Sequence, residues 1–223
     1  TGDPAVERLG NRQVKNFLTL TLLSIGAPIE LMGDEVRRTQ RGNNNAYCQD
    51  NESSWFDWTD ADRHADIHRF MKCLLALRAR GNLARRESPL TLNEILGQAR
   101  ITWHGITLNR PDWSDESHSL AMTARSFDGR FLIHAIANAY WEPLAFELPR
   151  AVGRHRGLRR LIDAALDSPH DICPGPDAPL VSDDRYPVQP RSVVVLFATA
   201  ALESEALGHP ERHRIGNSSK ESV

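Results

Sequence analysis

A polar segment over residues 33–62 holds the side chains best suited to binding a ligand. It opens with Gly33-Asp34-Glu35 and contains three consecutive asparagines, Asn43 to Asn45, with Tyr47 close behind. Amides and carboxylates can hydrogen-bond vicinal hydroxyls, and an aromatic ring can cover the apolar face of a sugar. On composition alone, an equally good interpretation is that the asparagines supply turns and left-handed backbone conformations.

Other kinds of chemistry have no comparable signal. The sequence shows no phosphate-binding glycine loop, no metal-binding histidine pair and no nucleophile elbow. We therefore expect neither a metal nor a cofactor. Asp34 and Glu35 resemble an acid/base pair, but adjacent residues leaving a strand point in different directions.

The flanking residues predict how this segment is held. Asp3 is a candidate N-cap and Pro4 fits the first helical position, so we expect a helix over residues 3–25 ending at Gly26. Its predicted buried face recurs at three- and four-residue steps: Val14, Phe17, Leu18, Thr21, Leu22 and Ile25. A short strand over 27–32 then leads into the polar loop. Helix, strand and loop in this order form one step of an α/β protein, where ligands bind beyond the strand's carboxyl end.

A second helix is predicted over residues 62–80, with Arg78 and Arg80 in its last turn and Gly81 closing it. Its apolar stripe consists of Ile67, Phe70, Met71, Leu74, Leu75 and Leu77. Residues 82–100 read as a connector.

Short β-prone runs separated by turn residues begin near Ile101. The predicted strands are 101–103, 120–124, 131–136, 144–148 and 192–197, and Asp128-Gly129 is a hairpin signal. This pattern predicts an antiparallel sandwich. The residues after about Ala200 are polar, which is typical of a disordered tail.

Composition excludes some partners. The formal net charge is only -2 with mixed signs, so we expect no nucleic-acid partner, and no apolar run approaches the roughly 20 residues that span a bilayer. Three cysteines, Cys48, Cys73 and Cys173, are a poor disulfide framework. They favour reduced thiols in a cytoplasmic protein.

Several segments together resemble one family. Residues 26–35, Gly-Ala-Pro-Ile-Glu-Leu-Met-Gly-Asp-Glu, are similar to the eighth-strand segment of the α-amylase superfamily, and residues 38–58 closely resemble bacterial glycogen debranching enzymes of the isoamylase type. Further similar motifs follow in the same order: Trp103-His104-Gly105, Pro111-Asp112-Trp113, Asn138 to Leu144, Phe146 to Pro149 and Arg191 to Leu196. The resemblance covers about residues 3–198.

The resemblance implies an α/β plus all-β architecture. Residues 1–97 would be the terminal βα portion of a (β/α)8 TIM barrel, residues 98–199 a C-terminal antiparallel β-sandwich, and residues 200–223 the tail. The implied activity is hydrolysis of α-1,6 branch linkages in glycogen or limit dextrin. The superfamily's catalytic carboxylates follow strands four, five and seven, so no catalytic residue is assigned here, and the missing N-terminal barrel portion is an implied partner. We expect this chain alone to be inactive.

Roles follow for individual residues. Those expected to contact or shape the donor-side glucose subsites are Asp34, Arg38, Asn43, Asn44, Asn45, Tyr47 and Asp50. Glu35 is expected to be a buried, hydrogen-bonded carboxylate that anchors the loop. Trp55 and Trp58 are interpreted as packing residues, Trp103, Trp141 and Phe146 as sandwich core, and His104 as making a hydrogen bond at the domain junction.

Three positions depart from the family pattern. Glu30 places a charge in an apolar strand and needs a partner, Val36-Arg37 replaces Phe-Gly at the loop's first turn, and Ala164 replaces Thr at an edge of the sandwich. A lone eighth strand would also lack its neighbours, so we expect the N-terminal third to be poorly packed. Two other functions stay open: a non-catalytic glucan-binding module, and a purely structural sandwich that braces the barrel.

Overall fold

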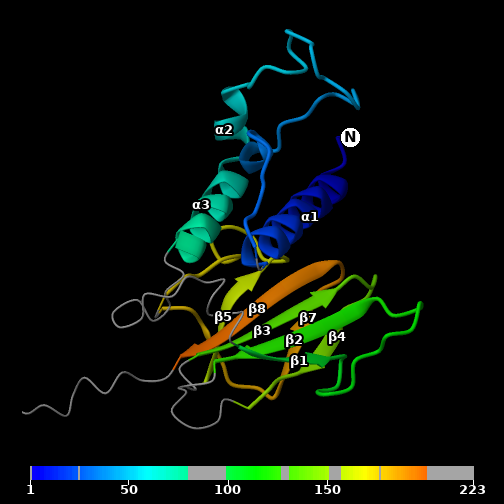
Figure 1. Cartoon of the computed structure of the whole chain (residues 1–223), viewed down its shortest axis with the longest axis vertical. Coiled ribbons are helices and arrows are strands. Elements are labelled where there is room, and N and C mark those ends of the chain that lie inside the picture. The colour runs from blue at the N-terminus through cyan, green and yellow to red at the C-terminus, as the bar shows by residue number, and fades with distance from the viewer. Residues whose placement is uncertain are drawn as a thin grey trace, which may run out of the picture.

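The computed structural model describes residues 2–24, 26–79, 99–126, 131–150, 157–175 and 177–199. Two long helices lie against a largely antiparallel β-structure, and a long loop extends beyond the helices (Figure 1). The helical elements are α1 (Pro4–Leu23), the 3-10 helix η1 (Asp34–Val36), α2 (Thr59–Arg63) and α3 (Ala65–Ala79). The strands are β1 (Arg100–His104), β2 (Ser119–Arg125), β3 (Phe131–Asn138), β4 (Leu144–Glu147), β5 (Leu158–Asp163), β6 (Leu180–Val181), β7 (Arg185–Val188) and β8 (Ser192–Thr199). Across those described ranges, no helix is long and apolar enough to cross a membrane.

Helix α1 begins as its sequence predicts. The Asp3 carboxylate accepts the backbone N–H of Ala5 at 2.8 Å, and Pro4 occupies the first helical turn. Leu18 and Leu22 are buried, but Phe17, which was predicted to lie on the same face, is exposed. Lys15 and Asn16 are buried in its place. The buried face of α1 therefore includes polar residues, and these residues bind specific partners.

The predicted second helix is two helices, because α2 ends before α3 begins at Ala65. The α3 side chains Ile67, Phe70 and Leu74 are fully buried, whereas Leu75 is exposed. Arg78, in the last turn of α3, donates to the carbonyl of Leu22 at 2.6 Å. It also donates to the carbonyls of Ser24 and Gly26. Arg78 thus satisfies carbonyls at the C-terminal end of α1 and ties the two helices together. Arg80, Gly81 and the connector at 82–98 lie outside the described residues.

The strand predicted over 27–32 is wrong for this chain. These residues have no regular secondary structure, and Ile29 is 90% exposed with Leu31 and Met32 also exposed. An isolated strand gains no ladder hydrogen bonds and buries no side chains, so its local preference is not enough to form it. The described residues supply no neighbouring strand to this segment.

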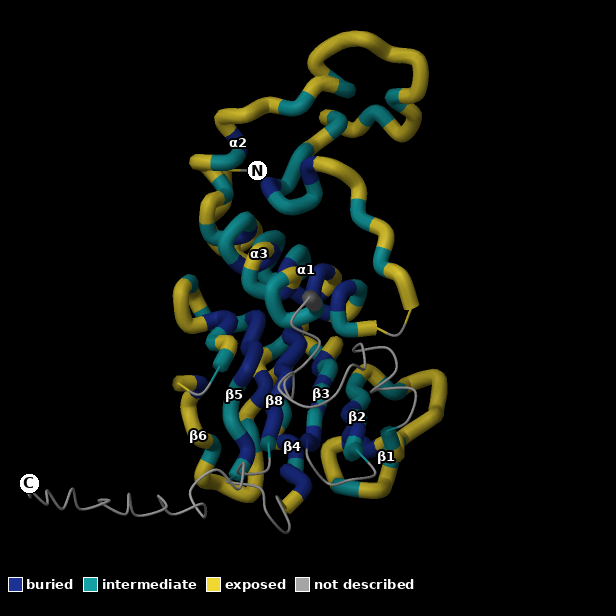
Figure 2. The backbone as a smooth tube through the Cα atoms, turned by 60° about the vertical axis from the view of Figure 1, so that its left-hand side comes forward, coloured by how far each residue is buried: buried dark blue, intermediate teal, exposed yellow. Residues whose placement is uncertain are grey.

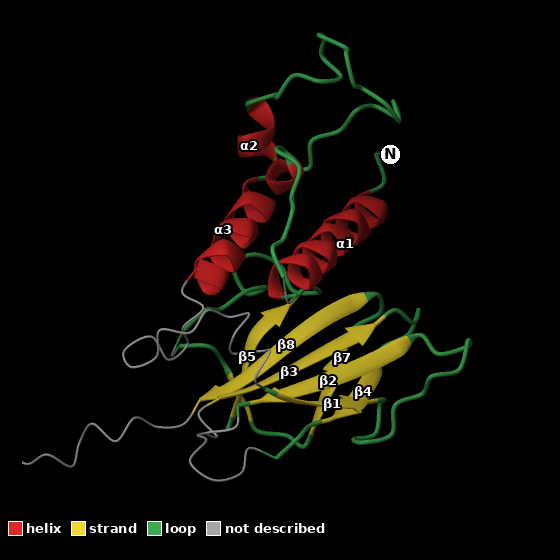
Figure 3. Ribbon diagram, viewed as in Figure 1, coloured by secondary structure: helices red, strands yellow, loops and turns green. Residues whose placement is uncertain are grey.

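The β-structure is antiparallel, as predicted. Six strands form one sheet in the order β1-β2-β3-β8-β5-β6, and β4 pairs with β7 in a second sheet (Figure 3). All five predicted strands are present within one or two residues, whereas β5, β6 and β7 were not predicted. Strands β2 and β3 flank the Asp128-Gly129 hairpin signal and pair over their full length, although residues 127–130 themselves lie outside the described ranges. The tail at 200–223 also lies outside them.

Ala164 lies just beyond the end of β5, which is next to the edge strand β6 in the sheet order. Strand β5 pairs with β8 on one side and with β6 on the other. Beyond its end, the backbone N–H of Ala164 donates to the carbonyl of Val193 at 3.1 Å, and its side chain is buried. A methyl group fits this packed position.

Two hydrophobic cores lie on opposite faces of the large sheet. One lies between this sheet and the β4–β7 sheet, and it includes Phe146, Val188 and Leu196. The other joins the sheet to the helices through Leu22, Phe70 and Val195 (Figure 2). The N-terminal helices are therefore well packed, contrary to the prediction that this third of the chain would be loose. Most of the segment between η1 and α2 is exposed instead.

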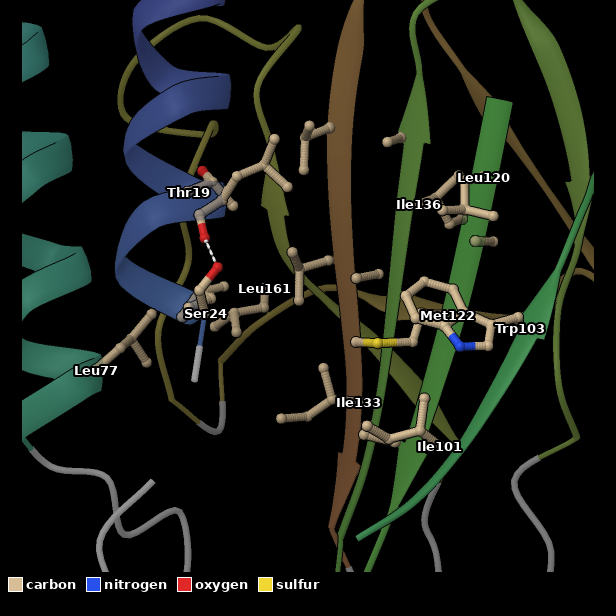
Figure 4. Close-up of a pocket in the computed structure, with 18 residues that line it drawn as sticks. Thr19, Ser24, Leu77, Ile101, Trp103, Leu120, Met122, Ile133, Ile136 and Leu161 are labelled. Atoms are coloured by element: carbon tan, nitrogen blue, oxygen red, sulfur yellow. Dashed lines mark hydrogen bonds between the residues drawn. The ribbon is translucent and has the colours of Figure 1, made fainter. Parts of the chain in front are cut away.

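An apolar cavity of about 500 Å³ lies where the helical core meets β1, β2 and β3 (Figure 4). Its wall includes Leu77 from α3, Met122 from β2 and Trp103 from β1. Thr19 and Ser24 also line the cavity, but their hydroxyls already donate to carbonyls of α1. The Trp103 indole N–H is then the one polar side-chain group of this described lining without a partner, which is too little to orient a polar ligand.

Candidate functional site

The predicted sugar-binding loop begins with a tight turn held by its own carboxylates. Gly33 has φ = 109°, a conformation that favours glycine. The Asp34 carboxylate accepts the backbone N–H of Leu31 at 3.1 Å, and the Glu35 carboxylate accepts the N–H of Gly33 at 2.7 Å. Both acids therefore face the chain's own backbone. Glu35 thus makes the hydrogen bond expected of it, but its side chain is half-buried rather than buried.

Arg38 joins the two limbs of the loop. Its guanidinium donates to the carbonyl of Ser54 at 2.8 Å and to that of Ser53 at 3.3 Å. The side chain lies over the opening turn, since a Cβ added at Gly33 would lie 2.6 Å from the Cβ of Arg38. Arg38 therefore holds the two limbs of the loop together by hydrogen bonds inside the loop.

The departure from the family pattern at Val36-Arg37 has a structural counterpart. Arg37 is left-handed, with φ = 57°, at the position where the family usually has glycine. Its guanidinium donates to the carboxylate of Glu7 at 3.0 Å and to the side-chain oxygen of Asn11 at 2.6 Å. Two bonds to α1 offset the strain of a non-glycine residue in this conformation. The turn survives the substitution.

Two of the three consecutive asparagines build local turns. The Asn43 side chain accepts the N–H of Asn45 at 3.0 Å, and the Asn45 side chain accepts the N–H of Tyr47 at 3.1 Å. These are Asx turns, so the turn interpretation holds for Asn43 and Asn45. The left-handed positions fall on Arg41, Gly42 and Cys48 instead. Asn44 is exposed, and its amide makes no hydrogen bond within the described ranges.

The loop between η1 and α2 is largely exposed (Figure 2), and it carries three exposed aromatic residues. Tyr47 is 85% exposed, and Trp55 and Trp58 are exposed as well. The Trp55 indole N–H donates to the Asp50 carboxylate at 2.7 Å. Trp55 and Trp58 are therefore not buried packing residues in this chain, which corrects that interpretation. Their faces are available to an apolar surface such as the face of a sugar ring.

Glu30 has no cationic partner within the described residues. Burial raises the pKa of its carboxyl, and the charge of Asp34 and a hydrogen bond to that residue raise it further. One oxygen of Glu30 is also buried without a hydrogen bond to any described residue. The partner that the sequence requires for this charge is absent from the described segments.

Comparison with known proteins identifies the β-structure. Residues 102–193 match the family model described as "Isoamylase 1-3, C-terminal". These residues form an isoamylase C-terminal domain. The predicted resemblance to isoamylase-type enzymes is confirmed, and the parent family is that of glycogen debranching glycoside hydrolases.

The curated relatives of this chain are much longer proteins. "Isoamylase 1, chloroplastic" from Oryza sativa subsp. japonica is 32% identical over 75% of the chain, which spans 20% of that relative. "Glycogen operon protein GlgX homolog" from Mycobacterium tuberculosis is 32% identical over 89% of the chain and 29% of the relative. The chain thus spans less than a third of the length of these relatives.

Two solved structures have a fold similar to that of this chain. A pullulanase from Bacillus acidopullulyticus aligns with a TM-score of 0.62 over 88% of this chain and 21% of its own, at 18% identity. A pullulanase from Paenibacillus barengoltzii, in complex with maltohexaose and alpha-cyclodextrin, aligns with a TM-score of 0.57 at 25% identity. It covers 90% of this chain and 26% of its own. The alignments extend well beyond residues 102–193.

The isoamylase C-terminal domain differs from prediction in its aromatic residues. Phe146 is core, as expected, whereas the hydrogen bonds of His104, including one of 2.8 Å to the Thr123 hydroxyl, lie within the β-domain and not at the predicted junction. Trp103 and Trp141 are exposed, which corrects their assignment to the core. A turn-rich context, with Glu and Pro directly after Trp141, was the signal that could have predicted exposure.

Proposed function

We propose that this chain is the C-terminal part of an isoamylase-type debranching hydrolase that cleaves α-1,6 branch linkages in glycogen or limit dextrin. Residues 1–97 would contribute the last βα portion of a (β/α)8 barrel, and residues 98–199 its C-terminal β-domain. Relatives named isoamylase and glycogen debranching enzyme support the proposal. The free thiols of Cys48, Cys73 and Cys173 fit a reducing compartment such as the cytoplasm.

One observation carries the barrel proposal. Ile29, Leu31 and Met32 form an exposed apolar run between a packed helix and a polar loop. This is the order of a βα step, in which the strand would be buried by neighbours on both sides. Burying apolar side chains of this size is worth about 1.5–3 kcal/mol each. The segment therefore has a strong reason to pair with strands of a barrel portion outside this sequence.

In this proposal the catalytic carboxylates and the substrate-binding loop come from different parts of the barrel. Retaining hydrolysis requires two carboxyl groups about 5–5.5 Å apart, one as nucleophile and one as acid. Asp34 and Glu35 are committed to backbone hydrogen bonds. The nucleophile and acid would therefore come from the rest of the barrel. In this proposal the loop forms the donor-side glucose subsites through Asp34, Arg38, Asn43, Asn44, Asn45, Tyr47 and Asp50.

Kinetics of an intact enzyme that carries this segment would test the proposal. Replacing Tyr47 or Asn44 with Ala removes an exposed side chain, so folding should be unaffected while KM for limit dextrin rises about tenfold. Glu52→Gln is the matched control, since Glu52 lies on the same loop and pairs only with exposed Arg41. Unchanged KM for both Ala variants would contradict the subsite assignment. The present chain alone should release no reducing ends from glycogen.

The exposed rings of Tyr47, Trp55 and Trp58 also favour a second function, a non-catalytic glucan-binding module. Affinity electrophoresis of the intact protein in glycogen gels separates the two. Retention without hydrolysis supports the module, and retention with hydrolysis supports the enzyme. Normal hydrolysis that is insensitive to the loop substitutions would leave this chain a structural brace.

A further inference from the structure

A cluster of exposed aromatic residues lies on the β-domain, apart from the long loop. Trp113, in the segment between β1 and β2, is 65% exposed, and Trp141, in the segment between β3 and β4, is 58% exposed. The β1–β2 segment lies at the β1 side of the sheet, whereas the loop that precedes α2 extends from the opposite end of the molecule (Figure 1). Large exposed aromatic patches usually mark a binding surface.

The rings form two groups. Trp113 meets Trp103 edge-on, with ring centroids 5.9 Å apart and an interplanar angle of 71°. Tyr140 and Trp141 lie 3.9 Å apart at 31°. His118 lies beside this second pair, 6.2 Å from Tyr140 and 6.1 Å from Trp141. Each group fixes the orientation of its rings.

A hollow of about 330 Å³ joins the two groups. Trp113 from one group and His118 from the other both line it. The remaining polar lining comes from Asp112, Ser114, Ser117 and Ser119. This hollow therefore differs from the 500 Å³ cavity, because it combines ring faces with hydrogen-bonding groups, which is what a sugar requires.

The polar groups of the hollow are held in defined states. The Asp112 carboxylate accepts the N–H of Ser114 at 3.0 Å. Hydrogen bonds from Ser114 also hold the pKa of Asp112 below its usual value, so it is an acceptor at neutral pH. His118 Nδ1 donates to the carbonyl of Glu116 at 2.6 Å. A carboxylate acceptor beside an imidazole ring and serine hydroxyls complements vicinal sugar hydroxyls.

The segment that carries Trp113 is rigid. The N–H of Asn109 donates to Nδ1 of buried His104 at 2.8 Å, and the N–H of Leu108 donates to the Glu147 carboxylate at 3.1 Å. A Cβ at Gly105 would lie 2.5 Å from the carbonyl oxygen of Arg110, so the chain folds back tightly here. A surface that is already ordered loses little entropy when a ligand binds.

We propose that this aromatic surface, defined by Trp113, His118, Tyr140 and Trp141, is a second α-glucan-binding site, separate from the loop before α2. The choice of an α-glucan rests on the proposed function, whereas the choice of a carbohydrate rests on the ring faces and the adjoining acceptors. The site would hold a glucan chain on the β-domain while another part of that polymer occupies the catalytic cleft.

Titration of the full chain with maltohexaose, followed by tryptophan fluorescence and calorimetry, tests the site. Trp113→Ala and Trp141→Ala should each raise Kd about tenfold, the scale of one lost aromatic contact. Phe17→Ala removes an exposed aromatic ring of α1, outside both proposed glucan surfaces, so it is the control and should leave Kd unchanged. The conservative variants Trp113→Phe and Trp141→Phe should retain binding, and thermal melts identify any variant that fails to fold.

Each outcome is decisive. No binding of maltohexaose, or binding unaffected by both Trp113→Ala and Trp141→Ala, would overturn the second site. Loss of binding on Tyr47→Ala alone would assign binding to the long loop, so the second site would fail while the proposed function stood. Binding that depends on Trp113 and Trp141, in an intact protein without debranching activity, would retain the site and reject the enzyme. Cellohexaose binding as well as maltohexaose would overturn α-glucan selectivity.

Discussion

Lys15 of α1 and Asp171, in the segment after β5, form a buried ion pair with Nζ 2.7 Å from Oδ2. Arg69 of α3 donates to the other oxygen of Asp171, and its Nε donates to the hydroxyl of Ser168 at 2.8 Å. One carboxylate therefore joins both helices to the β-domain. The helical and β parts of this chain share polar contacts as well as a hydrophobic core.

Asp171→Asn should destabilise the chain by about 3 kcal/mol, because removing one member of a buried pair leaves the other charge uncompensated. The free energy of unfolding from urea titration measures this loss. Asp66→Asn is the matched control, since Asp66 lies 3.8 Å from the same Nζ and its side chain is 34% exposed. Its effect should stay below about 1 kcal/mol. Equal effects of the two substitutions would contradict the assigned importance of Asp171.

A buried histidine pair should make stability depend on pH. His104 Nε2 lies 2.8 Å from the Thr123 hydroxyl, which lies 2.9 Å from His134 Nδ1. Burial, with the charges of His104 and Arg125, lowers the pKa of His134 from 6.5 to about 3. Below pH 6.5, His134 therefore takes up a proton in the unfolded chain but stays unprotonated in the folded chain. Stability from this group is complete above pH 6.5 and is lost as pH falls toward 3.

His134 should lower the free energy of unfolding by up to about 1.4 kcal/mol for each unit by which the pH falls. Urea unfolding of the wild type and of His134→Leu, measured from pH 7 to pH 4, should show a shallower decline in the variant. His170→Leu, at an exposed histidine, should decline in parallel with the wild type. A parallel decline of His134→Leu and wild type would contradict the assignment.

The left-handed backbone of Arg37 should reverse the usual ranking of alanine and glycine. Both Arg37→Ala and Arg37→Gly lose the bonds to Glu7 and Asn11, but only glycine relieves the strain at φ = 57°. Arg37→Gly should be about 1 kcal/mol more stable than Arg37→Ala. At exposed Lys72, inside α3, alanine should be more stable than glycine by about 1 kcal/mol. The same ranking at both sites would show that Arg37 is not strained.

Hydrogen exchange should follow packing rather than the predicted domain boundary near residue 97. Amides of α1 and α3 share the core of the sheet, so they should exchange as slowly as those of β3 and β8. Amides of residues 39–58 should exchange fast, because most of this segment is exposed and lacks regular structure. Mass spectrometry of peptic peptides resolves these segments. Fast exchange throughout α1 would show that the helices are an independent, weakly packed unit.

Local signals predicted much of this fold. Asp3 and Pro4 mark the start of α1 through backbone geometry and a hydrogen bond two residues away, so no distant contact is needed. Five strands were predicted from their own β-prone residues. Strands β5 and β7 were missed because Arg159 and Arg160 lie in one and Pro187 in the other, and only their pairing partners make these residues strand.

Local sequence signals were enough to predict the family, the start of α1, most of the antiparallel strands and the position of the polar loop. Tertiary structure decided what depends on neighbours distant in sequence. Residues 27–32 have strand-forming side chains but no strand beside them, so they stay unpaired and exposed. Trp103 and Trp141 look like core by residue type, yet whether a ring is buried depends on what folds over it, and composition cannot specify that.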